Sequence, residues 1–260
     1  MPQYIEHRYG KNVHIVHNLY LNTLLTQLCQ PETQQPFIQQ HVEELFRELF
    51  VISSTGELKK EQVRVRTRMS QQHKKIHLES EVLKRKQAAV SVSLARAGIP
   101  ASQVIYQQLN HILDPQFVRQ DHIWAARITD KKEHVTGAAL GAAKIGGDVK
   151  GATVFLPDPM GATGSTIIAT LDLYKKMFKG KAAKFVALHL IITPEYVQKT
   201  LAAHPDLIIY ALRIDRGLSS SKALKAIPGT YPKEERGLNE KQYIVPGAGG
   251  LGEILNNSFV

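Results

Sequence analysis

The residues best suited to chemistry lie in one loop, Asp158–Thr166, which reads DPMGATGST. An apolar run at 153–156 precedes the loop and predicts a buried strand, and apolar residues at helical spacing follow it from 167 to 177. A strand, a loop of small residues and a helix start form a geometry that binds phosphate, because the loop N–H groups point inward and the helix dipole favours negative charge. Asp158, at the strand end, suits sugar hydroxyls beside such a phosphate.

A simpler interpretation of the same loop stays open at this point. An ordinary strand-to-helix turn with a Ser or Thr N-cap has a similar composition. A Walker-type nucleotide loop is excluded, because no Gly-Lys-Ser or Gly-Lys-Thr follows the glycines. The elements around the loop must decide between an anion site and a plain turn.

The rest of the chain alternates short apolar runs, which predict strands, with apolar residues at helical spacing. Strands are expected at 88–92, 123–126, 153–156, 185–192 and 207–214, and helices at 19–28, 36–50, 99–113, 167–179 and 196–203. This order predicts an α/β fold in which helices cover both faces of a mostly parallel, twisted sheet. We expect one domain over residues 1–260, with an N-terminal helical segment and a turn at Ser53–Gly56.

Charged residues follow four of the predicted strands. Arg96, Arg127, Asp158 and Asp215 each fall just past a predicted strand end. In a sheet of this kind, ligands bind outside the carboxyl ends of the strands. We therefore expect these four residues to line one rim. The segment at about 128–150 is rich in glycine and lacks helical spacing, which predicts a flexible hairpin or flap beside that rim.

The segment Lys59–Lys86 is rich in basic residues, and the whole chain carries a formal charge of +10. Nucleic acid is a possible partner for such a surface, but no aromatic residue is interleaved for base stacking. A solvated strand and loop is the favoured interpretation, with alternating residues at 62–67 forming the strand. A phosphorylated small molecule is also strongly anionic, so charge alone does not choose the partner.

Composition bounds the remaining classes of function. The 260 residues contain no apolar run long enough to span a bilayer and no apolar signal region at the start, so we expect a cytoplasmic protein with no membrane partner. Cys29 is the only cysteine, which fits a reducing compartment. His14 and His17 have no further ligand at metal-binding spacing, so no protein metal site is expected.

Four segments, which follow one another along the chain in the same order as in the family, resemble the uracil phosphoribosyltransferases, a family of type I phosphoribosyltransferases. DPMGATGST is similar to the phosphoribosyl diphosphate loop of that family, and its DPM-x-ATG form resembles the uracil branch in particular. LARAGI at 94–99, HIWAAR at 122–127 and YIVPGAGGLGE at 243–253 resemble the other family motifs. Lys144 lies 14 residues before Asp158, at the spacing of the family's hood lysine. The resemblance covers roughly 11–50 and 88–260.

The resemblance implies that uracil and phosphoribosyl diphosphate react to give UMP and diphosphate, with Mg²⁺ carried by the phosphoribosyl diphosphate. It implies catalytic roles for Asp158 and Arg127. The residues implied for phosphoribosyl diphosphate are Arg96, Arg127, Asp158, Met160, Gly161, Ala162, Thr163, Gly164, Ser165 and Thr166. Those implied for uracil are Tyr243, Ile244, Gly249 and Leu251. The family implies a homodimer or higher assembly, and a GTP effector is a further partner to test.

The sequence departs from the family pattern in four places. Gly250 replaces an acid that helps to hold the diphosphate and its Mg²⁺, with no obvious substitute nearby. Gly252-Glu253-Ile254 stands where the family has Gly-Asp-Arg, so a second charge pair is altered. Ser165 stands where the family has glycine, so a positive φ there would cause strain. About twenty extra residues, 217–236, predict a surface loop.

These departures keep other functions open: a nucleotide sensor or RNA-binding regulator, or transfer to another base. The G-x-G-x-x-G run at 247–252 is a weak signal for a dinucleotide, because it opens no βαβ unit.

Overall fold

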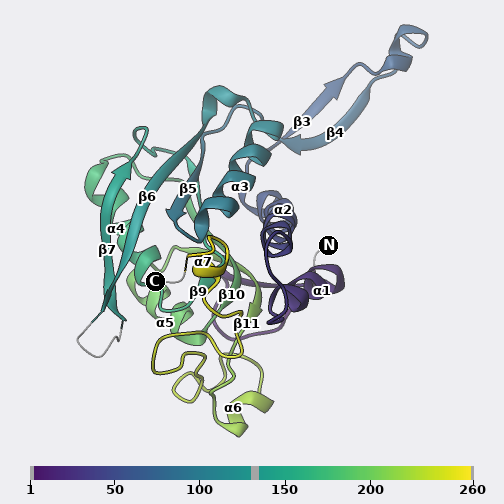
Figure 1. Cartoon of the computed structure of the whole chain (residues 1–260). Coiled ribbons are helices and arrows are strands. Elements are labelled where there is room, and N and C mark those ends of the chain that lie inside the picture. Colours follow the sequence, from purple (N-terminus) through teal and green to yellow (C-terminus); the bar gives the residue numbers. More distant parts are fainter. Residues whose placement is uncertain (1–2, 130–134, 259–260) are drawn as a thin grey trace.

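The computed structural model describes residues 3–129 and 135–258, and its centre is a nine-stranded sheet (Figure 1). The strand order is β1-β2-β11-β10-β8-β5-β6-β7, and β9 pairs with β10. The strands are β1 (Gln3–Tyr4), β2 (Val13–His17), β5 (Ala89–Ala95), β6 (Val118–Thr129), β7 (Val135–Lys144), β8 (Thr153–Pro157), β9 (Met160–Gly161), β10 (Lys184–Ile192) and β11 (Ile208–Ile214). Every neighbouring pair in the described sheet is parallel except the two edge pairs, β1–β2 and β6–β7. The predicted α/β fold with a mostly parallel sheet is confirmed.

Helices cover both faces of this sheet, because alternate side chains of each central strand point to opposite faces. Phe155 of β8 packs in the cluster formed with α1 (Leu19–Leu28), α2 (Phe37–Glu57) and α3 (Gly98–Ile112). Its neighbours Val154 and Leu156 pack in the opposite cluster, with α4 (Ser165–Met177) and α5 (Pro194–Ala203). The sheet therefore has a hydrophobic core on each side, and its strand ends are left to form a site.

Helix α2 starts where Pro36 predicts, but the predicted turn at Ser53–Gly56 is wrong. These residues form the last turn of the helix, and the Ser53 and Ser54 hydroxyls donate to carbonyl oxygens of the preceding turn. Tertiary contacts hold this turn in place. The Glu57 carboxylate accepts from the Tyr210 hydroxyl at 2.8 Å, and a Cβ on Gly56 would lie 2.8 Å from the same hydroxyl oxygen.

The basic segment forms an antiparallel arm of β3 (Lys60–Val65) and β4 (Leu78–Leu83), joined through a 3-10 turn at Arg68–Gln71. It projects from the body of the molecule (Figure 1). No residue of β3 or β4 is fully buried. The favoured interpretation, a solvated strand, is therefore confirmed, while the alternative of a nucleic-acid surface stays open.

The glycine-rich segment begins as the predicted hairpin. Strand β6 runs on through Arg127 to Thr129 because it pairs with β7, with Arg127 opposite Ala138. The prediction that Arg127 lies beyond a strand end is therefore wrong. After β7, the chain is held by Arg119, which donates to the carbonyl oxygens of Gly147 and Asp148 at 2.8 Å. Residues 130–134 of the predicted flap lie outside the described residues.

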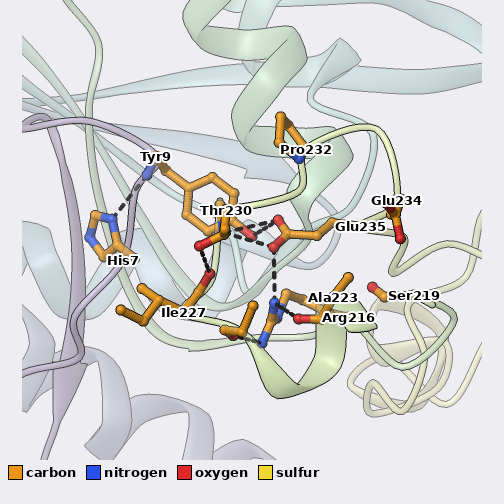
Figure 2. Close-up of polar contacts among 12 residues, drawn as sticks. His7, Tyr9, Arg216, Ser219, Ala223, Ile227, Thr230, Pro232, Glu234 and Glu235 are labelled. Carbon is orange, nitrogen blue, oxygen red and sulfur yellow. Dashed lines mark hydrogen bonds and ion pairs between the residues drawn. The ribbon is translucent and has the colours of Figure 1, made fainter. Parts of the chain in front are cut away.

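The extra segment 217–236 contains a short helix, α6 (Ser221–Lys225), and is anchored rather than loose. Figure 2 shows the buried Glu235 carboxylate at the centre of the anchor. It accepts from the Tyr9 hydroxyl, from the Gly229 N–H at 2.8 Å and from Arg216 Nη1 at 2.9 Å. The segment is therefore fastened both to the end of β11 and to the N-terminal segment.

Two short elements complete the described chain: a 3-10 turn, η2 (Pro115–Phe117), and a one-turn helix, α7 (Leu251–Ile254). In the described part of the chain, no helix is long and apolar enough to cross a membrane.

Candidate active site

A cleft of about 790 Å³ opens at the carboxyl ends of β5 and β8. Three distant parts of the chain line it: the turn after β5, the loop between β8 and α4, and the C-terminal segment 241–253. The lining residues are Leu94–Ala97, Ala125, Asp158, Met160–Ile167, Tyr196, Lys241–Ile244 and Gly249–Glu253. Every residue implied for either substrate lines this cleft, as far as the structure describes their side chains. The side chain of Arg127 lies outside what the structure describes.

The loop at 158–166 ends at the first turn of α4, as an anion site requires. Gly164 is the N-cap and adopts φ 78°, in the left-handed region that glycine enters at little cost. Ser165 follows as the first helical residue and is not among the described residues with positive φ. The strain expected at Ser165 is therefore absent. The first N–H groups of α4 have no partner within the helix, as an anion site requires, although that of Ser165 donates to the Thr163 hydroxyl at 3.4 Å.

Helix α5 supports the loop from behind. The Thr193 hydroxyl, at its N-cap, donates to the Ala162 carbonyl oxygen at 2.7 Å and accepts from the Tyr196 N–H. A Cβ on Gly164 would lie 2.6 Å from a methyl carbon of Thr200, so only glycine fits this close approach. The backbone of the loop is thereby fixed before any ligand arrives.

A buried histidine fixes the start of the loop. His189 Nδ1 donates to the Asp158 carbonyl oxygen at 2.6 Å, and its Nε2 accepts from the Tyr196 hydroxyl at 2.6 Å. Burial lowers the pKa of His189 to about 4, although the bond to the Asp158 carbonyl opposes the shift. The imidazole is neutral at physiological pH and acts as a fixed hydrogen-bonding bridge. The Asp158 carboxylate lies on the cleft side, where its Oδ1 accepts from the Met160 N–H at 3.3 Å.

Sequence patterns did not identify Lys199. It lies on α5, and its ammonium group donates to the Ser165 hydroxyl at 2.8 Å. This places a positive charge beside the phosphate loop. Only the packing of α5 against that loop reveals it, because Lys199 belongs to none of the motifs.

Arg96 lies in the turn after β5, with its side chain exposed. Its Nη1 donates to the Ser258 hydroxyl at 3.0 Å, so the C-terminal segment closes over this turn. The two backbones approach closely, since a Cβ on Gly252 would lie 3.4 Å from the Ala97 Cβ. Lys144, the predicted hood lysine, is exposed on β7 and is not among the lining residues.

An ion pair between Arg213 and Asp215 fixes the loop that the resemblance implies for uracil. Arg213 Nε donates to Asp215 Oδ1 at 2.6 Å, and Asp215 Oδ2 accepts from the Gly247 N–H at 2.7 Å. Asp215 is buried, so the prediction that it lines the rim with Arg96 is wrong. Its position just past β11 is as expected, but the carboxylate turns inward to fix Gly247, whose φ is 64°.

The base loop begins with a tight turn that sequence patterns also missed. Asn239 Oδ1 accepts from the Tyr243 N–H at 2.9 Å, and the Gln242 N–H donates to the Asn239 carbonyl oxygen. Gln242 has φ 63° and lines the cleft together with Lys241. Leu251 also lines the cleft, although its side chain is buried in the core.

The described residues hold no group of three or more His, Cys, Asp or Glu side chains that could bind a metal ion. His14 and His17 point to opposite faces, since they are three residues apart on β2. His14 stacks on Tyr210, with ring centroids 4.5 Å apart, and His17 Nδ1 lies 3.4 Å from the Asn22 amide nitrogen.

Known proteins resemble this chain in sequence and in fold. A curated uracil phosphoribosyltransferase of Thermococcus kodakarensis is 27% identical over 175 residues, which is 67% of this chain and 63% of that protein. The match thus spans less than two thirds of that relative's length. The solved structure of the AQ2163 protein of Aquifex aeolicus superposes with a TM-score of 0.69 at 18% identity, over 94% of this chain and 97% of that one.

The profile of the family described as "Uracil phosphoribosyltransferase" matches residues 15–230, well over half of the chain. The matched region includes the turn at Arg96 and the whole loop at 158–166. The chain therefore belongs to the uracil phosphoribosyltransferase family.

Proposed function

We propose that the protein transfers a phosphoribosyl group from phosphoribosyl diphosphate to uracil, giving UMP and diphosphate, as in pyrimidine salvage. One observation carries the proposal: a single cleft joins a phosphate loop, an arginine turn and a loop rich in backbone groups. These three parts correspond to the three parts of the reaction, namely the 5′-phosphate, the diphosphate and the base.

The chemistry at the ribose C1 requires charge stabilisation more than covalent participation by the protein. The C1–O bond to diphosphate breaks, a bond from the base nitrogen to C1 forms, and the proton on that nitrogen passes to solvent. A sugar cation develops while the bonds exchange. Groups fixed in advance around both partners lower this barrier, since they need not reorganise during the reaction.

Each part of the cleft has a role in this proposal. The first turn of α4 and the loop at 162–166 hold the 5′-phosphate, and the Asp158 carboxylate accepts from the ribose hydroxyls. Arg96 and Arg127 neutralise the diphosphate. The backbone around Tyr243, Ile244, Gly249 and Leu251 holds the ring, because uracil offers O2, N3–H and O4 for pairing with N–H and C=O groups.

Mg²⁺ bound to phosphoribosyl diphosphate would neutralise charge on the leaving diphosphate. Two carboxylates of the cleft lining, Asp158 and Glu253, provide oxygen atoms of the kind that Mg²⁺ prefers. The β6–β7 hairpin would exclude water, whose attack at C1 would hydrolyse the substrate. A homodimer or higher assembly, a GTP effector and a cytoplasmic location remain predictions of this proposal.

The direct test is UMP formation from radiolabelled uracil and phosphoribosyl diphosphate with Mg²⁺, with other pyrimidines and purines as competitors. Asp158→Asn should lower turnover at least about a hundredfold, because it removes a charge fixed beside the developing cation. Its circular dichroism should stay unchanged. Asp206→Asn, at an exposed position outside the cleft, is the matched control. Wild-type turnover in Asp158→Asn would refute the assignment.

The basic arm supports one competing function, an RNA-binding regulator that keeps the fold. In that case the wild-type protein would form no UMP with any base, and it would bind RNA with an affinity that falls steeply as salt increases. UMP formation without salt-dependent RNA binding would exclude this alternative. Efficient competition by another base would assign the same chemistry to that base instead.

A further inference from the structure

Glycine at position 250 makes room for another side chain in the cleft. A Cβ on Gly250 would collide with Oε2 of Glu253 and would lie 2.9 Å from its Cδ. The Glu253 carboxylate therefore fills the space that a side chain at position 250 would otherwise enter. Gly250 has φ −79°, which any residue can adopt, so the Glu253 carboxylate is what sets this steric limit.

Glu253 has no partner that would explain this placement as structural. Its side chain is half-buried and lines the cleft, yet within the described part of the chain its carboxylate makes no hydrogen bond or ion pair. Its backbone is well fixed: the N–H donates to the Gly250 carbonyl oxygen at 2.9 Å, and the carbonyl oxygen accepts from the Ser258 N–H at 3.0 Å. The Glu253 carboxylate is thus held at the cleft wall without an ion pair to any residue that the structure describes.

The location of Glu253 indicates which part of a ligand it meets. Helix α7 packs against the turn that bears Arg96, through the approach of Gly252 to Ala97 and the bond from Arg96 to Ser258. Glu253 therefore lies at the arginine end of the cleft, where an anion such as diphosphate would bind. A carboxylate can only accept hydrogen bonds, so it cannot bind a diphosphate oxygen directly. A divalent cation shared with the substrate removes this conflict, because Mg²⁺ is typically bound by one or two carboxylates together with substrate phosphates and waters.

We propose that Glu253 is a substrate-binding residue that contacts the Mg²⁺ of magnesium phosphoribosyl diphosphate, either directly or through its bound water, and that Gly250 is required to leave space for it. This inference rests on the proposed function, because it assigns one end of that substrate. Under this proposal, Glu253 supplies the carboxylate that position 250 lacks.

The test is calorimetric binding of phosphoribosyl diphosphate to the full chain, once with Mg²⁺ and once with EDTA, which needs no turnover. For the wild type, Mg²⁺ should strengthen binding. Glu253→Gln should reduce that strengthening about tenfold or more, which is the scale of effect for groups that support a bound metal. Its affinity in EDTA should be unchanged or slightly higher, since a negative charge has been removed. Glu240→Gln, an exposed acid outside the cleft lining, should retain the wild-type Mg²⁺ dependence.

Substitutions at position 250 provide an independent test. Gly250→Ala should displace the flexible Glu253 carboxylate without backbone strain, so it should weaken Mg²⁺-dependent binding as Glu253→Gln does. In a Glu253→Ala background, Gly250→Ala should have no further effect, because the two changes act through the same carboxylate. Moving the acid, in Gly250→Asp with Glu253→Ala, should restore part of the Mg²⁺ dependence. Thermal unfolding of each variant verifies that it is folded.

Failure of the inference and failure of the proposed function give different results. If the wild type binds phosphoribosyl diphosphate with Mg²⁺ and Glu253→Gln keeps the same Mg²⁺ enhancement, the role of Glu253 is wrong while the function stands. A change in uracil affinity alone would likewise overturn it and assign Glu253 to the base. If the wild type binds no phosphoribosyl diphosphate in either buffer, the function and the inference are both refuted.

Discussion

At the scale of single residues, Lys199 adds a cation that the motifs do not contain. Its ammonium group donates to the Ser165 hydroxyl of the phosphate loop at 2.8 Å. Two charges about 4 Å apart interact by about 1 kcal/mol even in water, so Lys199→Met should raise the KM for phosphoribosyl diphosphate about fivefold. The KM for uracil should not change. Steady-state kinetics with each substrate varied measures both values.

Lys176→Met is the control for this change, because Lys176 is also exposed and lies on α4 away from the loop. An equal rise in KM for both lysine variants would show that Lys199 contributes only to the general positive field of the protein.

His189 should make the fold sensitive to acid. Burial lowers its pKa from 6.5 to about 4, so the unfolded chain binds a proton that the folded chain excludes. This contribution to stability is fully present above pH 6.5 and is lost as the pH falls towards 4, by on the order of 3 kcal/mol. Urea unfolding between pH 7.5 and 4 measures it. His189→Gln should be less stable at pH 7 but should lose less stability on acidification. Parallel pH profiles for the two proteins would exclude His189 as the source.

At the scale of elements, the extra segment 217–236 depends on one buried ion pair. The side chains of Arg216 and Glu235 are 11% and 0% exposed, and Nη1 of Arg216 lies 2.9 Å from Oε1 of Glu235. Removing one charge leaves the other buried and unpaired, which costs about 3–5 kcal/mol. Glu235→Gln should therefore lower the free energy of unfolding by that amount in urea titrations.

The neighbouring acid offers a matched control for the anchor. Glu234 is exposed, and its carboxylate accepts from the Ser220 hydroxyl, a bond that the glutamine oxygen can keep, so Glu234→Gln should change the free energy of unfolding by less than about 0.5 kcal/mol. None of the residues that line the cleft comes from 217–236. If Glu235→Gln were as stable as Glu234→Gln, the segment would be held by contacts other than this ion pair.

Residue patterns correctly predicted the elements whose packing is visible in their own sequence. The run at 185–192 is apolar apart from His189 because both faces of β10 are covered, and that signal is visible in the sequence. The predicted C-terminal ends of α2 and β6 were wrong because residues outside each element determine where it ends. The turn at Ser53–Gly56 becomes helical through contacts with β11, and β6 extends past Ala126 because β7 pairs with it. The first contact joins residues far apart in the sequence and the second joins two adjacent strands, and the periodicity of a single element detects neither.

At the scale of the whole molecule, one part of the site carries its own geometry in a single motif. The loop at 158–166 does so, because a strand, small residues and a helix start suffice to define it. Asp215 and Glu253 do not. Asp215 follows a strand like Arg96 but turns inward to hold Gly247, and Glu253 matters only because Gly250 leaves space beside it. Such roles depend on how the C-terminal segment folds back over the sheet.

That construction has a measurable consequence, because the cleft exists only where three distant segments meet. A ligand that fills it should protect the backbone amides of 94–97, 158–167 and 241–253 from hydrogen exchange together. At a hundred times its Kd, magnesium phosphoribosyl diphosphate should also raise the free energy of unfolding by about 2.7 kcal/mol. Exchange measured by mass spectrometry, with the β3–β4 arm as the internal reference, tests the first expectation. Protection confined to 158–167 would mean that the loop binds phosphate alone and that the C-terminal segment takes no part in holding this substrate.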